Sequence, residues 1–133
     1  MVIFDDYNSN LSSLDHVREI KRGYPITLVA EIRARLGLTE SELANLLGIS
    51  IRTYHLRKST GHMSKRESER LYRFCYLLNL AKHALESKEH AQIWLRTLKK
   101  ALNGETPYQF CDTSPGYQEV INLLGRVEYG VFS

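Results

Sequence analysis

The feature that most constrains the fold of this chain is a pair of short helix patterns that meet at Gly48. The first opens at Thr39-Glu-Ser-Glu42, a capping box whose side chains satisfy the first free amides of a helix. The second begins at Ser50, a favourable N-cap. Ala44 permits close packing of two helices, and Gly48 tolerates the positive φ of a tight turn. The pattern therefore predicts a helix-turn-helix.

Helical spacing continues through the rest of the chain, and no segment shows the alternation of a β-strand. The helical segments begin at capping residues or prolines, and most of them end at glycine or asparagine. They are residues 25–36, 39–47, 50–58, 64–85, 87–102, a short turn from 107, and 115–129. We expect an all-α protein, with Cys75 and Cys111 as small reduced core residues.

The predicted organisation has three parts. Residues 1–24 start with a polar stretch and form an N-terminal arm that is a candidate for dimerisation. Residues 25–86 contain the helix-turn-helix, and residues 87–133 form a small helical domain that ends in a tail.

Positive charge is concentrated in one part of the chain. Residues 1–49 carry 5 basic and 7 acidic side chains, residues 50–75 carry 7 and 2, and residues 76–133 carry 6 of each. The basic block includes the second helix of the helix-turn-helix, the one that enters the major groove in DNA-binding proteins. A solvated helix face is the alternative. We favour a homodimer on double-stranded DNA, with these contacts: Ser50, Arg52, Thr53, Tyr54, Arg57, Lys58, Lys65 and Arg66.

An enzyme has little support in the sequence. The chain has no Gly-rich phosphate loop and no G-x-S-x-G motif, so we expect no catalytic residue and no cofactor. The best metal candidates, His83, Glu86 and His90, would share a helix face only if the helix ran through Ser87, where we expect a break. The uncharged stretches are too short to span a membrane and the N-terminus lacks a signal-peptide pattern, so we expect a cytoplasmic protein.

The C-terminal third is rich in aromatic residues. Trp94, Leu95 and Leu98 have helical spacing, which favours burial in their own domain over a partner surface. The ending Tyr129-Gly-Val-Phe-Ser133 has two interpretations, a frayed terminus or a peg for a pocket of a partner protein.

Two groups of residues resemble a known family. The first is Leu36-Gly-Leu-Thr-Glu-Ser-Glu-Leu-Ala44, Gly48-Ile-Ser-Ile-Arg-Thr-Tyr54, Leu56-Arg-Lys58 and Met63-Ser-Lys-Arg-Glu-Ser-Glu-Arg-Leu71. The second is Ala91-Gln-Ile-Trp-Leu95, Ala101-Leu-Asn-Gly104, Thr106-Pro107, Asp112-Thr113, Gly116, Val120 and Arg126-Val-Glu-Tyr-Gly-Val131. On these motifs, residues 25–133 resemble antitoxins of the Xre/ParS/MbcA family, the partners of RES-domain toxins in type II toxin–antitoxin systems.

The resemblance implies a dimeric protein that represses its own operon and occludes the active site of a RES-domain toxin that consumes NAD. Residues 87–133 would then be the toxin-binding domain, with the tail as a plug. Its expected toxin contacts are Trp94, Tyr129, Gly130, Val131, Phe132 and Ser133. Family members often have a Pro-Asn loop after the Trp-Leu pair, whereas here Arg96-Thr-Leu-Lys-Lys100 is expected to continue the helix. The alternative function is a stand-alone repressor whose C-terminal segment only dimerises.

Overall fold

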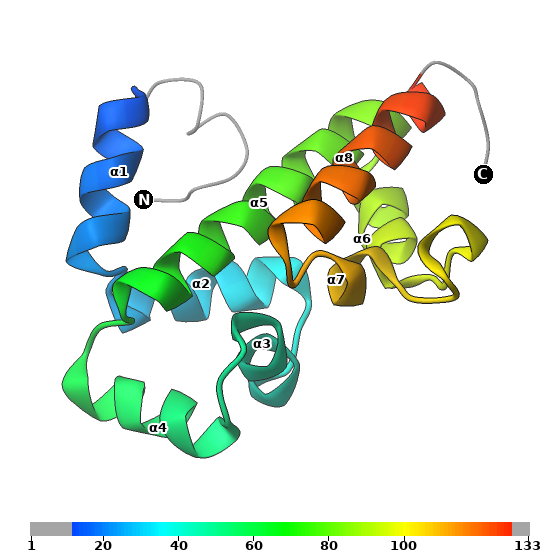
Figure 1. The fold of residues 1–133 in the computed structure, drawn as a ribbon. Helices are drawn as coiled ribbons and strands as arrows, with labels where there is room; N and C mark the ends of the chain where they lie inside the picture. The colour runs from blue at the N-terminus through cyan, green and yellow to red at the C-terminus, as the bar shows by residue number, and fades with distance from the viewer. Residues whose placement is uncertain (1–11, 129–133) are drawn as a thin grey trace. The chain divides into compact units, whose positions relative to one another are not determined.

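The computed structural model of this chain describes residues 12–128. Eight α-helices occur in this range (Figure 1). They are α1 (Ser13–Arg22), α2 (Ile26–Leu36), α3 (Glu40–Leu47), α4 (Ile51–Thr60), α5 (Lys65–Leu85), α6 (Lys88–Arg96), α7 (Pro107–Phe110) and α8 (Ser114–Glu128), with a 3-10 turn, η2 (Lys100–Leu102), before α7. Between residues 12 and 128 the only β-type pairings are two isolated bridges, Pro25–His62 and Lys99–Glu105. The predicted all-α class is confirmed.

The chain divides into two compact units, with the boundary between Cys75 and Tyr76 inside α5. The first unit holds α1 to α4 and the first half of α5. The second unit holds the rest of α5 together with α6, η2, α7 and α8. The sequence placed a division after residue 86, where the structure has the break between α5 and α6.

The helix-turn-helix is formed by α3 and α4, which lie against each other (Figure 1). The predicted capping box is present: the Thr39 hydroxyl accepts from the Glu42 amide at 3.1 Å, and the Glu42 carboxylate accepts from the Thr39 amide at 2.9 Å. Gly48 ends α3 in the left-handed region, with φ of 75°. Glycine takes this conformation at no steric cost, and Gly48 thereby sets the angle at which the chain enters α4.

The core of the first unit is built from the predicted apolar stripe of α2 and from residues of α3, α4 and α5. Its buried apolar side chains are Tyr24, Leu28, Val29, Ile32, Leu36, Leu38, Leu43, Ala44, Leu47, Tyr54, Met63, Leu71, Phe74 and Cys75. The loop between α1 and α2 is tied to α5, because the buried Tyr24 amide donates to the Ser68 hydroxyl at 2.9 Å. Helix α4 is anchored in this core by its one buried residue, Tyr54.

Helix α1 lies in the segment predicted as an N-terminal arm. Ser12 and Asp15 form a capping box at its start, and its one buried residue, His16, has its ring 5.0 Å from the ring of Tyr72. Residues 13–24 therefore belong to the first unit instead of extending from it as an arm. The sequence analysis missed this helix although two signals point to it: Ser12 and Asp15 have capping-box spacing, and Leu14, Val17 and Ile20 have helical spacing. Residues 1–11 lie outside the described range.

In the second unit, α7 packs against both α6 and α8. The buried apolar side chains of this unit are Leu77, Leu78, Ala81, Ala91, Leu95, Leu102, Tyr108, Cys111, Val120, Leu123 and Leu124. Cys75 and Cys111, one in each unit, are both buried free thiols, as the sequence predicted. Burial raises the pKa of Cys75, so its thiol stays protonated and behaves as a small apolar group.

The predicted continuous helix over residues 87–102 is wrong, because α6 ends at Arg96. Thr97 has an extended backbone, and its hydroxyl donates to the Ile93 carbonyl at 2.6 Å, which satisfies one of the open carbonyls at the helix end. The chain then forms a loop closed by the Lys99–Glu105 bridge. As a result Leu98 is 67% exposed, and its predicted place in the core is wrong as well.

Candidate nucleic-acid and partner interfaces

The start of α4 is organised by Ser50 and Thr53. The Ser50 hydroxyl accepts from the Thr53 amide at 3.0 Å and donates to the Thr53 hydroxyl at the same distance. Ser50 is therefore an N-cap, as predicted, and both hydroxyls are held in place at the first turn of the helix. This turn is the part of a recognition helix that approaches the bases in helix-turn-helix proteins.

The outward face of α4 carries residues that the sequence analysis did not single out. His55, Leu56 and Ser59 are exposed, and together with Arg52 and Thr53 they line one surface hollow. Positions 52, 55, 56 and 59 fall on one side of a helix because α-helices repeat every 3.6 residues. A helical projection from Arg52 would have found the three missed positions.

Arg57, predicted to contact DNA, is held by a carboxylate. Its Nε and Nη2 donate to the two carboxylate oxygens of Glu67, both at 2.9 Å, and Glu67 also accepts from the Ser64 amide at 2.9 Å. Glu67 is only 5% exposed. Burial alone would raise the pKa of Glu67, but the hydrogen bonds from Arg57 and Ser64 outweigh it and lower the pKa below its ordinary 4.5. The pair fastens the end of α4 to the first turn of α5.

This ion pair gives a prediction for stability. Glu67→Gln removes the charge that the two Arg57 donors need, and we expect the free energy of unfolding at pH 7 to fall by about 1.5 kcal/mol. A carboxylate with a lowered folded-state pKa stabilises the fold above its unfolded pKa and loses that effect as pH falls through the folded value. The difference from wild type should therefore be full at neutral pH and shrink below about pH 4.5.

Glu69→Gln is the matched control, since Glu69 is on the same helix and pairs with Arg73 at 3.1 Å, but in an exposed position. Exposed pairs contribute little, so this variant should lose less than about 0.5 kcal/mol in urea denaturation. Equal losses for the two variants would contradict a special role for Glu67.

Lys58, another predicted DNA contact, has its Nζ 2.8 Å from a carboxylate oxygen of Glu40 in α3. The hydrogen bond from Lys58 lowers the pKa of Glu40, which keeps the partner charged. Arg52, Lys65 and Arg66 are exposed and have no ion-pair or hydrogen-bond partner among residues 12–128. Of the five predicted cations, these three present their full charge to an anionic ligand.

Tyr54, also predicted as a DNA contact, is 1% exposed. Its ring is in the core of the first unit, 6.2 Å from the ring of His55, and burial raises the pKa of its hydroxyl. A buried ring is not available to DNA, so the place of Tyr54 in the predicted contact set is corrected to a core role.

In the second unit, Trp94 is half-buried and carries the Lys99 ammonium 4.7 Å from its ring centroid. Burial lowers the pKa of Lys99, because desolvation disfavours its charged form. Leu95 is fully buried, whereas Ile93 and Leu98 are exposed. The other predicted partner contacts, Tyr129, Gly130, Val131, Phe132 and Ser133, lie outside the described residues.

The spacing Asp112-Thr113-x-x-Gly116 has a structural reason. The Thr113 hydroxyl accepts from the Gly116 amide at 3.1 Å, so Thr113 caps the start of α8. At Gly116 the chain passes close to the Phe110 carbonyl, at the end of α7, and a Cβ there would overlap its oxygen. The short α7 and the long α8 can therefore meet at this angle only with glycine at position 116.

The histidines do not form a site on one helix. Helix α5 ends at Leu85, Glu86 has φ of 56°, and α6 starts after the Ser87 cap, so the predicted break between His83 and His90 is confirmed. Within residues 12–128 no three His, Cys, Asp or Glu side chains are grouped as metal ligands. In the same range no helix is long and apolar enough to cross a membrane.

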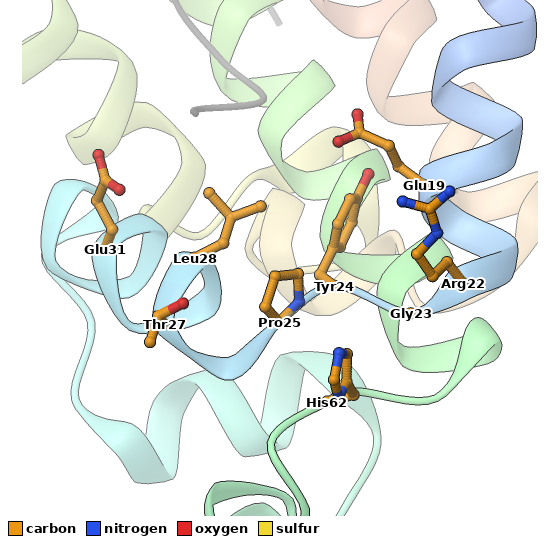
Figure 2. Close-up of a pocket in the computed structure, with 9 residues that line it drawn as sticks. All are labelled: Glu19, Arg22, Gly23, Tyr24, Pro25, Thr27, Leu28, Glu31 and His62. Atoms are coloured by element: carbon orange, nitrogen blue, oxygen red, sulfur yellow. The ribbon is translucent and has the colours of Figure 1, made fainter.

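A separate hollow of about 340 Å³ lies in the first unit, between α1, α2 and His62 (Figure 2). Figure 2 shows Glu31 at one end and Glu19 with Arg22 at the other, with the rings of Pro25 and Tyr24 between them. None of the predicted site residues lines it. Its mixed charges form no arrangement of nucleophile and base.

Comparison with known proteins agrees with this division of the chain. Residues 15–75 match the antitoxin Xre-like helix-turn-helix domain, and residues 80–130 match the antitoxin Xre/MbcA/ParS C-terminal toxin-binding domain. A protein of Photorhabdus laumondii named Antitoxin Xre is 32% identical over 128 residues, which cover 92% of this chain and 84% of that protein. A protein of the same name from Yersinia enterocolitica is 31% identical over 119 residues, covering 88% and 80%. The chain therefore belongs to the Xre antitoxin family, with a helix-turn-helix domain followed by a toxin-binding domain.

Proposed function

We propose that this chain is the antitoxin of a type II toxin–antitoxin system, and that it both represses its own operon and blocks a RES-domain toxin that consumes NAD. The observation that carries the proposal is the succession, in one chain, of the two antitoxin domains matched at residues 15–75 and 80–130. The two relatives, which match 92% and 88% of this chain, are antitoxins by name. No catalytic residue is needed for either action.

The DNA half of the proposal rests on the exposed start of α4. Arg52 and Thr53 are placed to reach base edges, with Ser50 ordering the first turn, while Lys65 and Arg66 supply charge for phosphates. One helix-turn-helix reads only a short half-site, so we propose a homodimer on a two-fold operator upstream of the operon. Residues 1–24, of which α1 is the described part, are the proposed dimerisation segment.

The toxin half rests on the C-terminal domain. We propose that residues 87–133 cover the entrance of the toxin's active site, with Trp94 beside the contact surface and the tail Tyr129–Ser133 as the plug. The apolar side chains of Val131 and Phe132, together with Tyr129, suit an apolar pocket better than water. Inhibition is then steric and needs no cofactor.

The plug gives a prediction. Phe132→Asp places a charge in an apolar pocket, and we expect it to weaken toxin binding by at least about 2 kcal/mol, or 30-fold, and to impair protection of cells. Phe132→Leu, which stays apolar, should keep most of the protection. DNA binding by the free protein should be the same for both variants. Full protection by Phe132→Asp would remove the plug while leaving the antitoxin assignment in place.

The whole proposal is tested by affinity capture from the native host, with the intact chain compared with a chain ending at Glu128. We expect the protein encoded beside this gene to be captured by the intact chain and lost or weakened on truncation. Capture by both forms would move the contact to the Trp94 region. No neighbour-encoded partner with either form, together with retained DNA binding, would favour a stand-alone repressor.

A further inference from the structure

Leu56 occupies an unusual place for an exposed leucine. Its side chain is 55% exposed on α4, between the exposed His55 and the ion-paired Arg57. A single exposed leucine needs no explanation on an ordinary surface. Here, however, it lies on the face of the helix that the proposed function turns toward DNA.

Leu56 lies beside an arginine, Arg52, in the same surface hollow. Leu56 follows Arg52 by four residues, so the two side chains are adjacent on one helix face, and both line the hollow on α4. Toward the helix start the hollow thus has the Arg52 guanidinium, which pairs with no residue between 12 and 128, and one turn later it has an apolar wall. The remaining lining residues, Thr53, His55 and Ser59, are polar.

This combination matches two features of the major groove. A guanine presents two acceptors that suit an arginine, and a thymine presents the one apolar group on the groove floor, its 5-methyl. Four residues of α-helix span about 6 Å, close to two steps of about 3.4 Å along a DNA strand. An arginine and a leucine with this spacing therefore fit a guanine and a thymine that are one or two base pairs apart.

We propose that Leu56 selects thymine in the operator through its 5-methyl group, one or two base pairs from a guanine contacted by Arg52. The inference rests on the proposed DNA-binding function and adds to it the base that this side chain recognises. Leu56 touches no phosphate in this arrangement, so it affects specificity more than general affinity for DNA.

The test uses the full chain and the DNA upstream of its own gene. The bound site is first located by footprinting, and each thymine in it is then replaced, one at a time, by deoxyuridine, which lacks only the methyl group. We expect one thymine per half-site at which wild type loses about 4-fold in affinity, the value of one buried methyl. Leu56→Ala should bind the unmodified site more weakly and show no further loss at that thymine, while Arg52→Ala keeps the sensitivity.

Leu98→Ala is the matched control, because Leu98 is also exposed, at 67%, but lies in the second unit, outside the helix-turn-helix. It should bind and discriminate as wild type does. Three results would overturn the inference. Leu56→Ala could bind the unmodified site as tightly as wild type does, or it could lose as much affinity on deoxyuridine as wild type does. Leu56→Ala could also change its oligomeric state while its base preference stays the same, which would make Leu56 a protein contact. Absence of any DNA binding by wild type would overturn the proposed DNA-binding function as well, which separates the two failures.

Discussion

Gly116→Ala is expected to destabilise the toxin-binding domain by about 3 kcal/mol, at the upper end of the usual range for overpacking. The new Cβ would overlap the Phe110 carbonyl oxygen, and this atom belongs to the backbone, so no rotamer change can move it away. The backbone movement needed to relieve this overlap would weaken the hydrogen bond from the Gly116 amide to the Thr113 hydroxyl. Thermal unfolding should show a midpoint lower by about 10 °C.

Gly125→Ala provides the control on the same helix. A Cβ at Gly125 would meet nothing within 4 Å, and alanine restricts the unfolded chain more than glycine does. This variant should therefore be more stable than wild type by about 0.5–1 kcal/mol. If both substitutions change the free energy of unfolding in the same direction, the close approach at Gly116 does not govern the packing of α7 and α8.

Arg52→Ala is expected to weaken operator binding by about 1–3 kcal/mol, or about 5- to 150-fold, while toxin neutralisation is retained. Arg52 is the cation at the start of α4 that no carboxylate holds among the described residues, so its full hydrogen-bonding capacity is available to a base. The loss should be concentrated on operator DNA, because base contacts carry sequence information and phosphate contacts do not.

Lys65→Ala separates the two kinds of contact. Lys65 is exposed at the start of α5, and as a proposed phosphate contact it should weaken operator and random DNA equally and reduce the slope of affinity against salt by about 1. Titrations at several salt concentrations measure both effects. Identical behaviour of the two variants on operator and random DNA would mean that Arg52 does not read a base.

Local rules were sufficient to predict most helix boundaries. The capping box at Thr39, the cap at Ser50 and the break at Ser87 act through hydrogen bonds between residues close in sequence, and all three are present. Because the caps fix where helices begin, the helix-turn-helix could be located from sequence alone. Thr97 shows the limit of such rules, since the end of α6 depends on a loop closed by residues 99 and 105.

The site was predictable only in part, because local spacing does not predict which side chains pair across the fold. Arg57 meets Glu67 ten residues later, and Lys58 meets Glu40 eighteen residues earlier. Both looked like free cations in the sequence, and a charge count therefore overstated the positive surface. Tyr54 was predicted to contact DNA together with Arg57, yet its ring is buried in the core of the first unit. The neighbouring positions His55, Leu56 and Ser59 are not lysine or arginine, so the charge pattern gave them no weight.

The central claim, that this chain neutralises a toxin, is tested most directly by growth of cells that express the product of the neighbouring gene. Alone, this product should arrest growth and deplete NAD; co-expression of the chain should restore both, and Arg52→Ala should restore both equally well. If growth and NAD remain depressed with the chain present in excess, or if the neighbouring product is harmless, the chain is not the antitoxin of that protein and the account is contradicted.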